Sequence, residues 1–200
     1  MAITLGYHGC SKETAQKLLS GSSFLISDKP YDWLGAGAYF WENDILRAYQ
    51  WALERRSKSP CVVGAVIDLG NCLDLTTQRG IHAVQKAYQS YFTLQRKSGQ
   101  HIPENQDAEH ARPGDIVLRY LDRAVINHLH ESYTRAKIRS SEFDTVRAMF
   151  PEGKPLYANA GFMEKTHVQI AVRKQNQVLG IFRVPDFQLM ELSIPSLYNF

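Results

Sequence analysis

The sequence predicts a single α+β domain, because β-prone segments lie at both ends of the chain and helical patterns fill its middle third. The 200 residues and 22.8 kDa fit one domain, and 44% hydrophobic residues are enough for a sizeable core. No internal repeat or low-complexity tract divides the chain. We therefore expect one compact unit that spans residues 1–200.

The first half predicts two strands and two helices around a glycine-rich turn. A strand over residues 2–8 is followed by Ser11, a residue type that caps helices, and then by a helix. After the turn GAGAYF at 35–40, Asn43 or Asp44 is expected to cap a second helix that runs to about Arg56. The β-branched run at 61–70 predicts a buried strand.

The middle third predicts helices. Apolar residues recur at helical spacing in two groups, one before and one after the breaker Pro113-Gly114. The first group is Ile81, Val84, Tyr88, Tyr91 and Gln95, and the second is Ile116, Leu121, Val125 and Leu129. We expect both groups to face the core, with an exposed connection between them.

The last third returns to strands, at 143–150, 165–173 and 177–184. The polar residues 174–176 join the last two, which we expect to pair antiparallel. Strand alternation places His167, Gln169 and Ala171 on one face of the penultimate strand.

Composition argues for a protein of the cytoplasm. The three cysteines include no CxxC pair, which disfavours a disulfide framework or a thiolate zinc site. No run of about 18 to 20 apolar residues and no signal-peptide pattern occurs, so we expect no membrane partner. A net charge of +3 is too mild to identify a nucleic-acid binder, and the basic clusters 55–58 and 135–139 are typical of solvated faces.

Three positions stand out: His8 at the end of the first strand, Tyr39 after the Gly-Ala-Gly turn, and Gln169 in a late strand. They lie within YHG at 7–9, GAGAYF at 35–40 with AYQWA at 48–52, and THVQIAV at 166–172. This order resembles the diphtheria-toxin and poly(ADP-ribose)-polymerase branch of ADP-ribosyltransferases, which a His, Tyr, Glu triad marks. The resemblance implies a split antiparallel β-sheet core with flanking helices, interrupted here by a helical insertion at about 77–140.

The resemblance also implies that the chain binds NAD+ as a substrate, without a metal. His8 would offer a ring nitrogen to the adenosine ribose, and the backbone of Gly9 would approach the nicotinamide carboxamide. Gly37 belongs to the turn that leads to Tyr39. The cationic nicotinamide ring favours an electron-rich aromatic face, so Tyr39 and Tyr49 are expected to sandwich it.

Gln169 stands where the family usually has a glutamate that binds the nicotinamide ribose. Glutamine keeps the hydrogen bond but loses the charge, which weakens stabilisation of an oxocarbenium-like transition state. Similar proteins present the acceptor on the loop before this strand, where Glu152 and Glu164 lie. Glu152 is therefore a candidate base, and Gln169, Tyr39 and Glu152 are the expected catalytic residues.

These residues predict a mono-ADP-ribosyltransferase that transfers ADP-ribose to a macromolecular acceptor, either protein or nucleic acid. A toxin-like effector with a neutralising partner protein would suit this single domain. One alternative is a catalytically silent nucleotide-binding module, in which Gln169 marks lost chemistry. Another is an RNA 2′-phosphotransferase of related fold, which would need basic residues that the late-strand motif lacks.

Other sites fit the sequence less well. The turn at 35–40 lacks the third glycine of GxGxxG, and no Walker-type loop occurs. His128 and His130 lie about 200° apart around a helix, so both cannot face one metal ion. Cys10 could pair with His8 as a nucleophile, but no acid nearby would orient the histidine.

Overall fold

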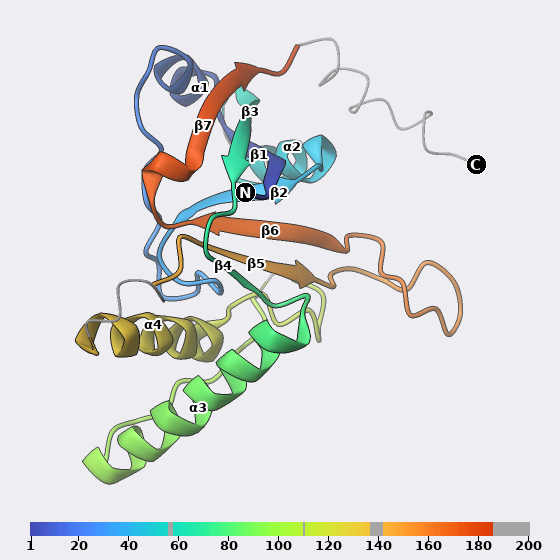
Figure 1. Cartoon of the computed structure of the whole chain (residues 1–200). Helices are drawn as coiled ribbons and strands as arrows, with labels where there is room; N and C mark the ends of the chain where they lie inside the picture. Colours follow the sequence, from blue (N-terminus) through green and yellow to red (C-terminus); the bar gives the residue numbers. More distant parts are fainter. Residues whose placement is uncertain (56–57, 110, 137–141, 186–200) are drawn as a thin grey trace.

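The computed structural model describes residues 1–55, 58–109, 111–136 and 142–185. Within these ranges the chain is α+β, with four α-helices and a seven-stranded mixed sheet (Figure 1). The strands are β1 (Ile3–Ser11), β2 (Ala38–Glu42), β3 (Pro60–Asp68), β4 (Cys72–Asp74), β5 (Thr145–Phe150), β6 (His167–Val172) and β7 (Val178–Arg183). The helices are α1 (Lys12–Leu19), α2 (Ile45–Glu54), α3 (Gln78–Ser98) and α4 (Tyr120–Arg135), with a 3₁₀ turn at Gln175–Gln177. Arg56, Lys137 and Arg139 of the basic clusters lie outside the described residues.

The sheet consists of two halves that share a short seam. Its strand order is β4-β5-β6-β2-β1-β3-β7, with all neighbours antiparallel except β4 and β5. β1 and β3 pair over nine residues, but β1 and β2 pair only at Gly6–Glu42 and Tyr7–Trp41. β2 meanwhile pairs with β6 from Ala38 to Trp41. The sheet therefore opens between β1 and β2 beyond Tyr7.

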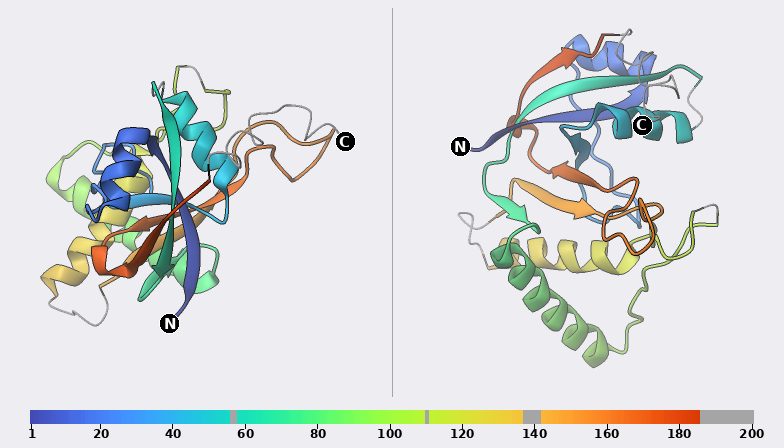
Figure 2. Two further views of the ribbon diagram at one scale, coloured as in Figure 1. Left: turned by 90° about the horizontal axis from the view of Figure 1, so that it is seen from above. Right: turned by 90° about the vertical axis from the view of Figure 1, so that its right-hand side faces the viewer.

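Helices cover the two halves differently (Figure 2). α1 packs on one face of the β1-β3-β7 half through Ala15 and Leu18, against Phe40 and Val63. α2 covers the opposite face, where Ala48 joins a cluster with Tyr7, Trp41, Val62 and Val184. α3 and α4 pack beneath the β4-β5-β6-β2 half, and their buried residues meet Val146, Ala148 and Ala171. The cluster beneath α1 also contains Phe40 of β2 and Ile170 of β6, so it joins the two halves of the sheet.

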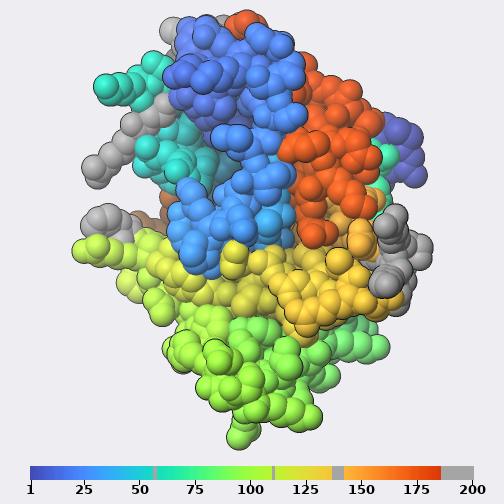
Figure 3. Space-filling view, turned by 90° about the vertical axis from the view of Figure 1, so that its left-hand side faces the viewer, coloured from blue at the N-terminus to red at the C-terminus, as the bar shows by residue number. Residues whose placement is uncertain are grey.

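The helical middle third forms a layer of its own. α3 and α4 stack below the rest of the molecule, as the space-filling view shows (Figure 3). Val125 and Leu129 of α4 are buried, as predicted. The prediction that the apolar residues of α3 all face the core is wrong for Ile81 and Tyr88, which are exposed. Ile116 precedes α4 with a φ of 47°, so it is not helical. No helix in the described residues combines the length and apolarity that a membrane span requires.

Local sequence signals are confirmed at the helix starts. The hydroxyl of Ser11 accepts a hydrogen bond from the backbone N–H of Thr14, and the carboxylate of Asp44 accepts one from Arg47. These bonds satisfy N–H groups that a first helical turn leaves open. Both predicted caps therefore have a direct physical basis.

The predicted pairing of the last two strands is wrong. β6 has β5 and β2 as its neighbours, whereas β7 crosses to the far edge and pairs with β3. Both edges of β6 are already occupied, so the turn at Gln175–Gln177 leads the chain to the other half of the sheet. The polar turn marked a strand boundary correctly but not a hairpin.

Candidate functional site

The opening between β1 and β2 is bridged by a histidine. Nδ1 of His8 lies 2.8 Å from the backbone carbonyl oxygen of Tyr39, which fixes the ring across the gap. The ring also contacts Phe24 edge-on at a centroid distance of 5.2 Å, and Phe40 in a tilted arrangement at 5.7 Å. Burial lowers the pKa of His8, so the imidazole is neutral at pH 7. Since a carbonyl only accepts, Nδ1 carries the proton and Nε2 is the acceptor.

Gly9 directs its backbone into the same opening. The N–H of Asn43 donates to the carbonyl of Leu5, so the odd-numbered residues of β1 turn their backbone groups toward β2. Tyr7 follows this pattern in its pairing with Trp41, and Gly9 is the next such residue, past the end of the ladder. Its N–H and C=O therefore face the gap. A Cβ at Gly9 would collide with the backbone carbonyl of Ala48, so α2 also requires a glycine here.

Tyr39 and Gly37 build the turn that enters β2. The hydroxyl of Tyr39 accepts from the N–H of Leu34 at 3.0 Å and donates to the carbonyl of Gly35 at 2.8 Å. Burial raises the pKa of Tyr39 well above its usual value, so the phenol stays protonated. Gly37 lies so close to β6 that an added Cβ would be 3.0 Å from the Cβ of Ala171. The phenol of Tyr39 therefore stabilises the turn before β2, and the backbone carbonyl of Tyr39 accepts the hydrogen bond from His8.

Gln169 lies on β6 opposite Trp41, on the sheet face that carries Tyr39. Its Oε1 accepts a hydrogen bond of 2.7 Å from Nε1 of Trp33. The Trp33 ring in turn packs edge-on against Phe150, at 5.0 Å. An indole N–H can only donate, so this bond fixes which end of the amide is oxygen.

Tyr49 lies on α2 in the apolar cluster that includes Tyr7 and Val62. The next aromatic residue, Trp51, lies two positions along the chain and about 200° further around the helix, and it contacts Trp41 at a centroid distance of 5.7 Å. Trp41 is the cross-strand partner of Gln169. On the side of α2 that faces β2, the aromatic residue is thus Trp51.

Glu152 lies just beyond β5, in the connection that projects from the sheet (Figure 1). Its Oε2 lies 2.9 Å from Nη2 of Arg47, whose side chain is 7% exposed. Lys165 is 3.8 Å from the other carboxylate oxygen, and Nδ1 of His167 is 4.0 Å from Oε2. The carboxylate therefore lies within a cluster of basic groups.

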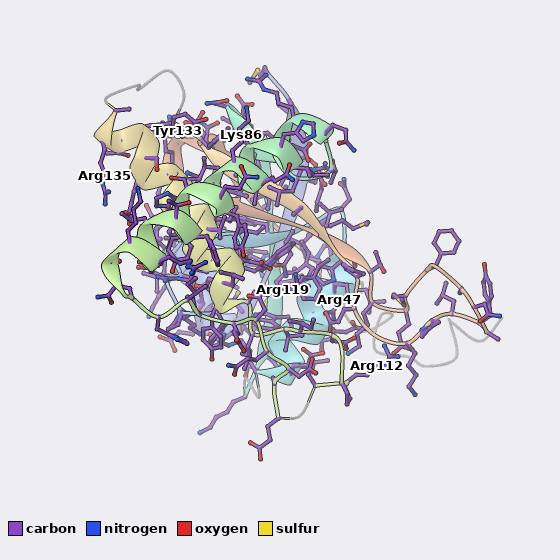
Figure 4. All side chains as sticks on the ribbon, turned by 90° about the horizontal axis from the view of Figure 1, so that it is seen from below. Arg47, Lys86, Arg112, Arg119, Tyr133 and Arg135 are labelled. Atoms are coloured by element: carbon purple, nitrogen blue, oxygen red, sulfur yellow. The ribbon has the colours of Figure 1, made fainter. Side chains whose placement is uncertain are left out.

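Arginines surround the base of this connection. Arg112 donates to the carbonyl of Gly153 at 2.6 Å, and the guanidinium of Arg119 lies 4.5 Å from the ring centre of Phe150. Figure 4 shows Arg47, Arg112 and Arg119 on the side from which the connection projects, whereas Arg135 lies at the other end of α4. Arg47, Arg112 and Arg119 thus lie near the points where β5 ends and β6 begins.

A groove of about 480 Å³ opens beside Trp33, along the edge of the sheet. The other residues that line it come from β5, from the turn before α3 and from the start of α3: Leu75, Thr76, Ile81, Val84, Ala148 and Met149. Among the described residues, no three His, Cys, Asp or Glu side chains lie close enough together to hold a metal ion. This groove is lined mainly by apolar side chains, and Trp33, whose indole donates to Gln169, is one of them.

The structure thus places Tyr39 and Gln169 on one face of the sheet, and Glu152 beyond the end of β5, 4.0 Å from His167 of the same strand as Gln169. The ring of His8 lies on the other face, because His8 and Tyr7 alternate along β1, and it joins the group through the carbonyl of Tyr39. Sequence reasoning missed Trp33, which donates to Gln169, and Arg47, which pairs with Glu152. Comparisons with family models, curated proteins and solved structures found no match to this chain.

Proposed function

We propose that the chain is an NAD+-dependent mono-ADP-ribosyltransferase with an ADP-ribosyltransferase-like split sheet. The observation that carries the proposal is the opening between β1 and β2, where the Gly9 backbone is turned into the gap beside His8. A carboxamide has one acceptor and two donor hydrogens, so it matches an adjacent N–H and C=O. Nε2 of His8 supplies the acceptor that a ribose hydroxyl needs.

The position of Gln169 supports the same proposal. It lies on the strand next to β2, on the face that carries Tyr39, so a dinucleotide held at Gly9 would extend its nicotinamide ribose toward β6. Oε1 of Gln169 accepts one hydrogen bond from Trp33 and keeps a second lone pair, and the amide nitrogen of Gln169 can still donate. In this proposal Gln169 orients the ribose, and much of the rate gain comes from positioning.

A silent nucleotide-binding module is the second candidate. One observation that favours it is the neutral Gln169, whose side-chain oxygen already accepts a hydrogen bond from Trp33. Another is the Tyr39 hydroxyl, because both of its hydrogen bonds are made to residues of the turn that precedes β2. Both candidates bind NAD+, but they differ in whether nicotinamide leaves.

The test is to incubate the purified protein with adenylate-labelled NAD+ and cell extract, and to measure nicotinamide and labelled products. Release of nicotinamide with label on a macromolecule supports the transferase. Protease digestion and nuclease digestion of separate samples then identify the acceptor. His8→Ala is expected to weaken NAD+ binding, and His101→Ala, at an exposed histidine, is the matched control. Binding without nicotinamide release would favour the silent module, and no binding would refute both.

A further inference from the structure

The connection between β5 and β6 carries an apolar tip, residues 155–163. The tip contains no charged side chain, and three of its large apolar residues, Leu156, Tyr157 and Phe162, are 59%, 62% and 67% exposed. The connection projects away from the sheet (Figure 1 and Figure 4). Large apolar side chains that gather on a projection mark a contact with another molecule, because water leaves them unpacked.

The tip holds its shape through its own backbone. The N–H of Leu156 donates to the carbonyl of Phe162 across the hairpin at 3.0 Å. In the turn, the N–H of Ala160 donates to the carbonyl of Tyr157 at 3.0 Å, and Asn159 has a φ of 63°, which asparagine tolerates. Because these peptide groups are paired within the tip, it can enter an apolar groove without leaving them unsatisfied.

The apolar groove of about 480 Å³ lies at the root of this projection. Met149, which lines the groove, is the penultimate residue of β5, and the connection begins directly after Phe150. The other walls include Trp33 and, from α3, Ile81 and Val84. Ile81 is 45% exposed and Met149 is 57% exposed. The projection thus has an open apolar surface at its root as well as at its tip.

A tip and a groove at opposite ends of one projection fit a two-fold pair of identical chains. When two projections lie side by side in opposite directions, each tip reaches the root of the other, and the same contact forms twice. The exposed parts of the three large side chains amount to about 350 Å² per tip. With an equal area of groove, one contact buries about 700 Å², which is below the range of stable interfaces, whereas two bury about 1,400 Å², which is within it.

We propose that two copies of the chain associate about a two-fold axis, with the tip of each protomer seated in the groove of its partner. The tip would then pack against the partner's Trp33, whose indole donates to Gln169 at 2.7 Å. Each protomer would thereby cover one wall of the candidate site of the other. Association of the two copies requires no NAD+, so it can be tested apart from the proposed function.

The experiment is sedimentation equilibrium over a series of protein concentrations, without NAD+. The weight-average mass should rise from 22.8 kDa toward twice that value as the concentration increases. Phe162→Lys in the tip and Ile81→Glu in the groove each bury a charge in the contact. Because each change occurs twice in the pair, the dissociation constant should rise about a hundredfold or more. Leu179→Lys and Leu94→Glu, at leucines that are 49% and 48% exposed outside the tip and the groove, are the matched controls.

An equimolar mixture of the two variants shows whether the tip and the groove meet. In a mixed pair, the unchanged tip of the Ile81→Glu protein enters the unchanged groove of the Phe162→Lys protein. The second contact of the same pair brings the new lysine opposite the new glutamate, and these charges attract. The mixture should therefore associate more strongly than either variant alone.

Three results would overturn this association. The first is a mass of 22.8 kDa at every concentration, which would leave the groove to another partner. The second is a dimer that either variant leaves intact, because its interface would lie elsewhere. The third is a mixture that associates no more strongly than its components. Thermal unfolding checks the fold of each variant, and Met149→Glu, at a groove residue that is 57% exposed, replaces Ile81→Glu if that variant does not fold.

Discussion

Replacing Glu152 by glutamine tests what this carboxylate does. Glu152 pairs at 2.9 Å with Arg47, whose side chain is 7% exposed. A guanidinium buried to this degree destabilises the fold when its partner loses charge, because the remaining charge is uncompensated. Glu54 is the other carboxylate near Arg47, but it lies 3.9 Å away and is 46% exposed. It can replace Glu152 only in part.

The magnitude follows from this geometry. Removing one partner of a fully buried ion pair costs about 3 to 5 kcal/mol. Glu152 itself is 16% exposed and Glu54 remains, so we expect Glu152→Gln to lower the free energy of unfolding by about 2 to 3 kcal/mol. In a domain of this size, that corresponds to a fall in Tm of roughly 4 to 12 °C.

Urea unfolding followed by circular dichroism measures the effect. The control is Glu164→Gln, an exposed glutamate of the same connection, which should change stability by less than about 0.5 kcal/mol. Equal stability of the two variants would refute the structural role of the Arg47 pair. If Glu152→Gln also kept NAD+ binding but lost nicotinamide release, Glu152 would take part in the reaction as well as in the ion pair.

Three further predictions concern the site and one buried histidine. Gln169→Glu should retain NAD+ binding and raise NAD+ hydrolysis, because it restores a carboxylate beside the ribose; unchanged turnover, measured as nicotinamide release, would contradict this placement. Tyr39→Phe should lower the free energy of unfolding by about 1 to 2 kcal/mol, because the N–H of Leu34 and the carbonyl of Gly35 lose a buried partner; urea unfolding that matches the unchanged protein would refute the clamp. Burial lowers the pKa of His130 to about 3. As the pH falls from about 6.5 to about 3, this histidine therefore binds a proton in the unfolded state before it does so in the folded state, and the free energy of unfolding should decrease. His130→Leu should flatten that decline by about 1.4 kcal/mol per pH unit in denaturation series at several pH values, and an unaltered slope would argue against a buried neutral ring.

The elements that the sequence predicted well depend on local physics. The caps at Ser11 and Asp44 need only a side-chain oxygen and the N–H groups of the next turn. The buried strand Pro60–Asp68 agrees with its apolar run because α1 packs on one of its faces and α2 on the other. In each case, the residues that decide the structure lie within a few positions of one another.

Elements that depend on distant partners could not be predicted in the same way. The stripe on α3 was expected to be buried, but this helix packs mainly on α4, so its buried residues are Gly80 and Ala87 while Ile81 is 45% exposed. The hydrogen bond from Trp33 to Gln169 joins residues from opposite ends of the chain. Alternation predicted that His167 shares a face with Gln169, but only the folded chain reveals that its Nε2 has no partner.

The interleaved strand order has a consequence for synthesis on the ribosome. β2 pairs with β6 along one of its edges, where Ala38 lies opposite Val172, and β3 pairs with β7, where Val63 lies opposite Arg183. Until the last third of the chain has emerged, both of these strands present bare backbone edges, which are templates for unwanted association. A nascent chain that stops before β5 would therefore be prone to aggregate, and completion of the sheet must await the final strands.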